Sequence, residues 1–248
     1  MKQEDTKQVI LEKALELFSA KGYDSVSMDE IAKAVGVKAP SLYNHFSGKR
    51  AIFDAIVEST AMQYEKYTDA IHVHVQDAER DFTVFSEMEE DALVQKVRKI
   101  FLYSLHDKAI SRFRRMMTLE QFRSPTLSAL YSARYVDRLT DYHARIFESL
   151  IKRGEIKDEN PRMLVMMYVA PIIMLLGVCD RQPEREEECV KKLDAHVRLF
   201  YRTFRTADIS PKTEIVSPNR RADYACIPKK HGSNIPREES ENGKELRK

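Results

Sequence analysis

The sequence predicts an all-α protein in which an N-terminal three-helix domain is joined by a long helix to a C-terminal helical bundle. Composition favours this class, because the 248 residues are 43% apolar and include only 7 glycines and no tryptophan. So few glycines leave little turn chemistry for a many-stranded sheet, and the apolar content suffices for a buried core. Apolar residues also recur every three or four positions along much of the chain, which is the period of an α-helix.

Two helices are predicted in the first 36 residues. The first spans about residues 6–21, where apolar side chains recur at helical spacing before Gly22. The second starts at Ser27, and Glu30 three residues later completes a capping-box pattern. This second helix is expected to end at Gly36, because glycine commonly follows the last residue of a helix.

A third, short helix and a long fourth helix come next. In the third, about residues 39–46, Leu42 and Phe46 share one face, and Pro40 can occupy the first turn without losing a hydrogen bond. The fourth begins near Lys49 and keeps an apolar stripe along its length. It is expected to connect the small domain to the rest of the chain.

Beyond the long helix, further helices are predicted with proline or glycine at most of the breaks. They span about residues 91–106, 108–123, 125–153, 161–180 and 183–204. Elements of this length, with no strand pattern between them, indicate a helical bundle. Prolines interrupt a polar sequence over residues 206–248, so this tail is expected to be disordered.

The last predicted helix carries a seam of apolar residues, spaced 3, 4, 3 and 4, which is typical of helices that pack nearly parallel or antiparallel. The preceding helix is strongly apolar over residues 163–179. Together they predict a subunit interface in a homodimer. Its candidate contact residues are Leu175, Leu193, Val197, Phe200 and Phe204.

Several classes of function are disfavoured. Residues 163–179 fall short of the about 20 residues that cross a bilayer, and they contain a proline and a glycine, so a helix buried between subunits is favoured over a membrane span. The three cysteines form no metal-binding spacing, so no metal or cofactor is expected. The N-terminus lacks the apolar core of a secretory signal, which favours a cytoplasmic location. No nucleophile–base pattern or P-loop appears, so an enzyme is not expected.

Positive charge is concentrated around the third helix, although the formal net charge of the chain is only +2. Residues 31–53 include Lys33, Lys38, Lys49 and Arg50 and no acidic residue. Such a local patch can attract phosphates even when the whole chain is nearly neutral. Lys49 also begins a helix, where backbone N–H groups and the helix dipole favour a phosphate.

The third helix has the size and polar surface to enter a DNA major groove, which is about 12 Å wide. With Leu42 turned inward, the outward residues are Pro40, Ser41, Tyr43 and Asn44, and His45 lies at the flank. Two short helices joined by a glycine-containing turn, the second of them polar outside, indicate a helix-turn-helix.

The segment GYDSVSMDEIAKAVGVKAPSLYNHFSGKRAIFDAI, residues 22–56, resembles the DNA-binding signature of TetR-type regulators. In that family the second helix of the motif reads DNA, and a Tyr-x-His-Phe run followed by a lysine anchors it; Tyr43, His45 and Lys49 match. The resemblance also implies DNA contacts at Ser27, Pro40, Ser41 and Asn44. Lys38 departs from the Ser or Thr that is common at its position, which puts the operator preference in doubt.

The resemblance implies a homodimeric transcription regulator that binds double-stranded operator DNA, most often as a repressor released by a small-molecule effector. Residues 1–50 would form its helix-turn-helix domain and residues 51–205 its effector-binding and dimerisation domain. A co-regulator or scaffold that acts through protein partners, with weak DNA binding, remains the alternative. Aromatic and methionine side chains of the bundle are candidates for an effector pocket: Phe113, Met117, Phe122, Tyr135, Tyr142 and Met167.

Overall fold

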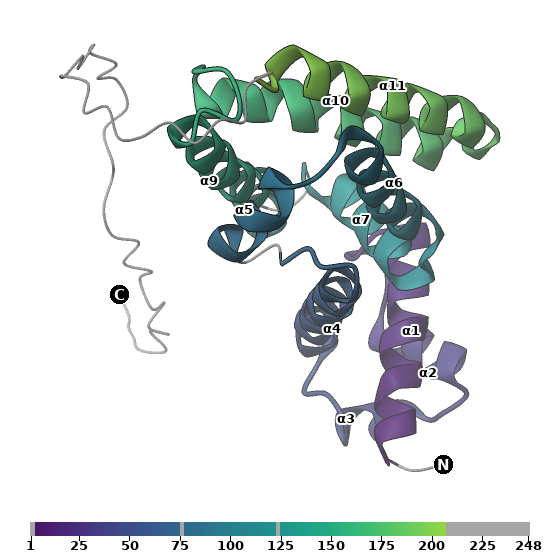
Figure 1. Ribbon diagram of the computed structural model, residues 1–248. Helices are drawn as coiled ribbons and strands as arrows, with labels where there is room; N and C mark the ends of the chain where they lie inside the picture. Colours follow the sequence, from purple (N-terminus) through teal and green to yellow (C-terminus); the bar gives the residue numbers. More distant parts are fainter. Residues whose placement is uncertain (1–2, 75–76, 123–124, 207–248) are drawn as a thin grey trace, which may run out of the picture. The chain divides into compact units, whose positions relative to one another are not determined.

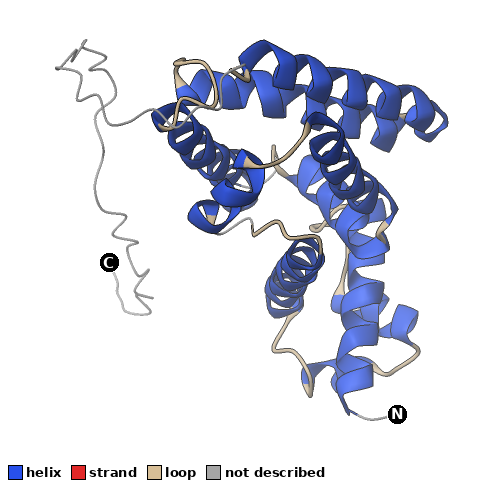
Figure 2. Cartoon of the chain, viewed as in Figure 1, coloured by secondary structure: helices blue, strands red, loops and turns tan. Residues whose placement is uncertain are grey.

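The computed structural model describes residues 3–74, 77–122 and 125–206, and over these ranges it contains helices and no β-strand (Figure 1, Figure 2). The predicted all-α class is confirmed. The tail predicted to be disordered lies outside the described residues from residue 207 onward.

The N-terminal helices are α1 (Gln3–Lys21), α2 (Met28–Val35), α3 (Ala39–Tyr43) and α4 (Lys49–Ala70). The predicted capping box is present at α2: the Ser27 hydroxyl accepts from the Glu30 amide, and the Glu30 carboxylate accepts from the Ser27 amide. Gly36 follows α2 with a φ of 84°, a left-handed conformation that glycine adopts without steric cost. Local backbone chemistry therefore sets both ends of this helix.

Helix α3 is shorter than its apolar pattern predicts and ends at Tyr43. The amides of His45 and Phe46 both donate to the carbonyl of Leu42, at 2.9 Å each, so the chain tightens into a turn there. Phe46 still packs against the core, beside the fully buried Leu42. The change in backbone form does not alter which side chains face inward.

The remaining helices are α5 (Ala78–Ser86), α6 (Glu90–His106), α7 (Lys108–Glu120), α8 (Pro125–Ser132), α9 (Arg138–Lys152), α10 (Pro161–Arg181) and α11 (Glu186–Phe204). A π-helical segment, Ala133–Asp137, joins α8 to α9, so the single helix predicted from Pro125 is nearly continuous. Helix α5 is not predicted by the sequence pattern. It begins at Asp77, whose side chain accepts from the amide of Arg80.

One hydrophobic core joins the first four helices to α7 and α8. Phe18 of α1, Leu42 of α3 and Phe53 of α4 are fully buried there. Phe113 and Met117 of α7 belong to the same core and are at most 1% exposed. Helix α7 therefore packs against both α1 and α4 (Figure 1).

A second group of core residues fills the bundle formed by α5, α6, α9, α10 and α11. All five residues predicted for a subunit interface are buried inside this bundle, with exposed fractions of at most 8%: Leu175, Leu193, Val197, Phe200 and Phe204. The seam of α11 therefore packs against α6 and α10 of the same chain. The 3–4 spacing indicates that a helix packs alongside another, and it does not say which chain supplies the neighbour.

Candidate nucleic-acid interface and ligand cavity

Helix α3 keeps exposed most of the side chains predicted to contact DNA. Tyr43 is 56% exposed, and Lys38, Pro40 and Asn44 are also exposed, whereas Ser41 is half-buried. Lys38 precedes the first turn and makes no side-chain capping bond. The separation of inward and outward faces agrees with the predicted orientation of the helix.

Two other predicted contact residues have roles inside the domain. The hydroxyl of Ser27 is exposed but caps α2. His45 is half-buried, and its Nδ1 atom is buried without a hydrogen-bond partner among the described residues. The backbone amide of His45 donates to the carbonyl of Leu42, and this bond closes a turn that contains Tyr43 and Asn44.

Lys49 joins α4 to the turn between α1 and α2. Its Nζ donates to the carbonyl oxygens of Tyr23, at 2.9 Å, and Asp24, at 3.3 Å, and it lies 4.4 Å from the centroid of the Tyr23 ring. The amide of Tyr23 in turn donates to Oε1 of Glu120 at 3.0 Å, from α7. Because Lys49 already binds two carbonyls, it positions the helix-turn-helix from within, and it is not a free cation at the surface.

We therefore expect Lys49→Met to lower the free energy of unfolding by about 1–3 kcal/mol, because the substitution removes the donor to two backbone carbonyls and one cation–π contact. Urea denaturation of the purified protein measures this. Lys38→Met is the matched control, since Lys38 is exposed and makes no capping bond. Unchanged stability of Lys49→Met, with loss of DNA binding, would instead indicate that Lys49 contacts a phosphate.

The surface around α3 carries positive charge from two exposed lysines. Lys33 of α2 and Lys38 are both exposed, whereas Arg50 pairs with Asp54 at 2.8 Å. Lys33 and Lys38 are therefore the cations in this segment that are most available to a phosphate backbone.

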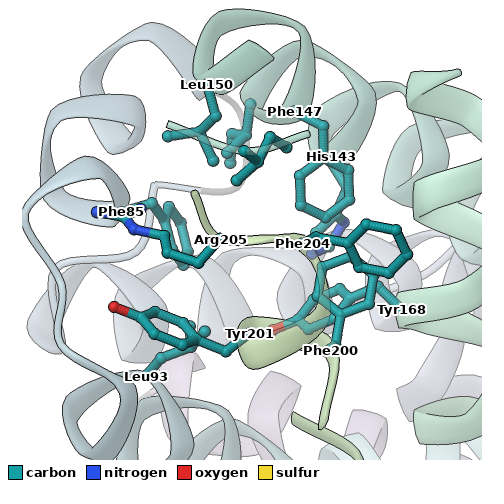
Figure 3. A pocket seen from close by; sticks show the side chains of 12 residues that line it. Phe85, Leu93, His143, Phe147, Leu150, Tyr168, Phe200, Tyr201, Phe204 and Arg205 are labelled. Carbon is teal, nitrogen blue, oxygen red and sulfur yellow. The ribbon is translucent and has the colours of Figure 1, made fainter. Parts of the chain in front are cut away.

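A cavity of about 60 Å³ lies in the C-terminal bundle, between α5, α6, α9, α10 and α11. Aromatic side chains form much of its wall: Phe85, Phe147, Tyr168, Phe200, Tyr201 and Phe204. Figure 3 shows His143, Phe204 and Tyr168 on one side of the cavity and Phe85 and Tyr201 on the opposite side. Concave apolar sites of this kind, between the helices of a bundle, are common ligand sites.

The predicted effector residues lie in other environments. Phe113 and Met117 are buried against α1–α4. Phe122 is 88% exposed and Met167 is 50% exposed. Tyr142 is buried, and its hydroxyl donates to a carboxylate of α5. None of these five residues lines the cavity.

The residues that line the cavity differ from those that the sequence pattern predicts for an effector pocket. Phe200 and Phe204 were assigned to a subunit interface, and they instead close the cavity from α11. The aromatic content of α9 and α10 indicated a pocket, but the register of the helices decides which ring faces it, and the sequence does not give that register. The side chain of Tyr135, the remaining candidate, lies outside the described residues.

Helix α10 leaves an apolar face exposed, without a partner among the described residues. Met163, Met166 and Met174 are 57%, 62% and 60% exposed, and Ile173 is 39% exposed. These residues recur at helical spacing on the side opposite Leu164, Val165, Tyr168 and Leu175, which are buried. By length and composition α10 could cross a membrane, and 28% of its most apolar window is buried inside the chain.

The N-terminal helices match a known family. Residues 10–56 match the family model described as bacterial regulatory proteins, tetR family. The helix-turn-helix domain of this chain belongs to the TetR family. The matched residues run from α1 to α4 and include the whole helix-turn-helix described above.

Two named transcriptional regulators of the helix-turn-helix type match over different shares of the chain. The negative regulator of the biofilm operon icaADBC, IcaR of Staphylococcus aureus, is 46% identical over 52 residues, which are 21% of this chain and 28% of IcaR. The probable transcriptional regulator YttP of Bacillus subtilis is 23% identical over 199 residues, 80% of this chain and 88% of YttP. The chain thus spans little more than a quarter of IcaR and most of YttP.

A solved structure has the same fold as this TetR-family chain. The crystal structure of a putative TetR-family regulator from Mesorhizobium loti aligns with a TM-score of 0.60 and 24% identity, and the alignment covers 83% of this chain and all of that one. The fold likeness therefore extends beyond the helix-turn-helix into the C-terminal bundle, where sequence identity to named regulators is low.

Proposed function

We propose that this TetR-family protein is a sequence-specific DNA-binding transcriptional repressor. The observation that carries the proposal is helix α3, which buries Leu42 and leaves Tyr43 and Asn44 exposed beside Lys38. Side chains of this type on a helix behind a rigid turn can bind phosphates and base edges in the major groove. The similarity to IcaR, a negative regulator, extends over 52 residues and supports the same role.

The proposed repressor is a homodimer whose two subunits meet at the exposed face of α10. The opposite side of α10 packs in the bundle, whereas this face is apolar and exposed to water. Contact with a second copy of the chain would bury the exposed apolar surface. Leu199 of α11 is 67% exposed and is a further apolar side chain at the surface of the bundle. A two-fold dimer would place two α3 helices in successive major grooves, about 34 Å apart, on a palindromic operator.

We further propose that a small molecule in the cavity releases the operator. A ligand can lower DNA affinity only if it binds more tightly to a dimer whose α3 helices are wrongly spaced or oriented. Helix α7 could transmit a change from the bundle to the helix-turn-helix. Glu120, at the end of α7, accepts from the amide of Tyr23, and Lys49 donates to the carbonyl of the same residue.

Selection of bound DNA from a random duplex pool, at two salt concentrations, tests the proposed function. A palindromic site recovered with the purified protein supports it. Recovery of no common sequence, or only of DNA whose binding disappears with salt, would favour a protein that acts through other partners.

Tyr43→Ala is expected to weaken operator binding roughly tenfold to hundredfold, because Tyr43 is exposed on α3 and available to the DNA. The free energy of unfolding should stay nearly unchanged for the same reason. A binding titration and urea denaturation measure the two effects. Met62→Ala on α4 is the control, since Met62 is 63% exposed and lies outside α3. Equal operator affinity for both variants would show that Tyr43 does not contribute to the DNA interface.

A further inference from the structure

The polar groups that line the cavity determine which ligand it can hold. Most of the wall is carbon, and the polar side chains that line it are His143, Tyr168, Tyr201 and Arg205. A buried polar group costs free energy unless it is hydrogen-bonded, so each of these groups either has a partner already or favours a ligand that supplies one.

Arg205 is already neutralised. Its Nη2 donates to the carbonyl of Ser86, and its Nη1 lies 3.7 Å from Oε2 of Glu155, a carboxylate that is 5% exposed. Tyr201 is also occupied, since its hydroxyl donates to the carbonyl of Met88 at 3.3 Å. Glu155 also pairs with Arg153, at 2.9 Å. The polar atoms of Arg205 and Tyr201 are therefore engaged by groups of the chain, whereas His143 and Tyr168 are the cavity groups left to bind a ligand.

His143 presents a hydrogen-bond acceptor. Its Nδ1 donates to the carbonyl of Leu139 at 2.8 Å, because a carbonyl can only accept. Burial lowers the pKa of the His143 ring, so the ring is neutral at pH 7 and Nε2 keeps its lone pair. No described residue donates to Nε2.

Tyr168 presents a hydroxyl next to His143. The two ring centroids are 5.7 Å apart, and no described residue hydrogen-bonds to the Tyr168 hydroxyl. Burial raises the pKa of Tyr168, so the hydroxyl stays protonated and can donate. One hydroxyl on a ligand could donate to His143 and accept from Tyr168, because a hydroxyl has one donor and two lone pairs.

We propose that the cavity binds an uncharged aromatic alcohol or phenol, whose ring contacts Phe147 and Phe200 and whose hydroxyl donates to Nε2 of His143. This rests on the proposed regulator, in which the same molecule would be the effector. The cavity of about 60 Å³ is smaller than the roughly 150 Å³ that holds benzene in an engineered core. The aromatic walls on α9 and α11 must therefore separate when the ring enters, and binding changes the packing of the bundle.

Calorimetric titration of the full-length protein with 4-ethylphenol, 4-ethyltoluene and 4-ethylbenzoate tests the proposal without DNA. These probes share a ring and differ by a hydroxyl, a methyl or a carboxylate. We expect 4-ethylphenol to bind about fivefold tighter than 4-ethyltoluene, the factor supplied by a hydrogen bond between neutral groups, and 4-ethylbenzoate to bind most weakly. Equal affinity of the phenol and the toluene, tightest binding of the benzoate, or no binding of any probe would each overturn the proposal.

Two variants locate the binding site. His143→Phe should reduce the preference for the phenol over the toluene, while the toluene affinity stays near its original value and the Tyr168 hydroxyl can still donate to the phenol. His143→Gln should restore part of the lost preference through its amide oxygen. Met167→Ala is the matched control, because Met167 is exposed on α10 and does not line the cavity. A preference that is undiminished in His143→Phe would overturn the assignment. Binding of 4-ethylphenol by a protein that recovers no operator would support the cavity assignment and refute only the regulator.

Discussion

Met174→Glu is expected to convert the proposed dimer into monomers and to reduce operator binding by orders of magnitude, while the subunit remains folded. Met174 is 60% exposed on the apolar face of α10, so the substitution leaves the core of the subunit intact. In a two-fold interface every substitution occurs twice, and a carboxylate buried there without a partner costs several kcal/mol. Loss of the dimer removes one of the two α3 helices from the operator. Sedimentation velocity and a binding titration measure both effects.

Phe200→Glu is the matched comparison, because Phe200 belongs to the seam that the sequence predicts for the interface. It is 8% exposed, and its ring centroid lies 4.9 Å from that of Tyr168 and 5.6 Å from that of Phe147. A carboxylate there should unfold the bundle, with a loss of about 3–5 kcal/mol or more, similar to loss of a large core ring. If the Phe200→Glu protein is folded and monomeric and the Met174→Glu protein is dimeric, the subunit interface lies at the seam of α11 and not at the exposed face of α10.

Structural features that depend on a few neighbouring residues could be predicted from the sequence. The capping box of Ser27 and Glu30 and the left-handed Gly36 fix α2 through bonds within eleven residues of chain. The inward position of Leu42 follows from helical periodicity alone. The family signature covers the same stretch, so the fold and the candidate reading surface of the first domain were predicted together.

Features that depend on contacts between distant parts of the chain could not be predicted from the sequence. Lys49 donates to the carbonyls of Tyr23 and Asp24, which lie 26 and 25 residues earlier in the chain. The sequence pattern shows no sign of these bonds, and the position of Lys49 at a helix start indicated a phosphate contact. Helix α5 has nine residues, too few for a long apolar period, and its place depends on contacts with α9. The seam of α11 was correctly identified as a packing surface, but its neighbour is intrachain because α6 and α10 fold onto it.

Asp81 of α5 is the clearest long-range contact of this kind. It is fully buried and accepts three hydrogen bonds: from the amide of His74 at 2.6 Å, from Nδ1 of His74 at 2.6 Å and from the hydroxyl of Tyr142. Burial, and then this bond to Asp81, raises the pKa of Tyr142, so the hydroxyl stays protonated and donates. His74 lies just after α4, and Tyr142 precedes His143 on α9, so Asp81 connects the long helix to the wall of the cavity.

Asp81→Ala is therefore expected to lower the free energy of unfolding by about 3–5 kcal/mol, because it leaves the buried Tyr142 hydroxyl and the half-buried His74 without an acceptor. Tyr142→Phe should cost only about 1 kcal/mol, since it removes one hydrogen bond and the polar group with it. The exposed Glu79→Ala on the same helix should change the free energy of unfolding by less than about 0.5 kcal/mol. Urea denaturation of the three variants measures these differences. If Asp81→Ala is no less stable than Glu79→Ala, the buried carboxylate does not hold α5 to α9, and the connection from α4 to the cavity must run through other contacts.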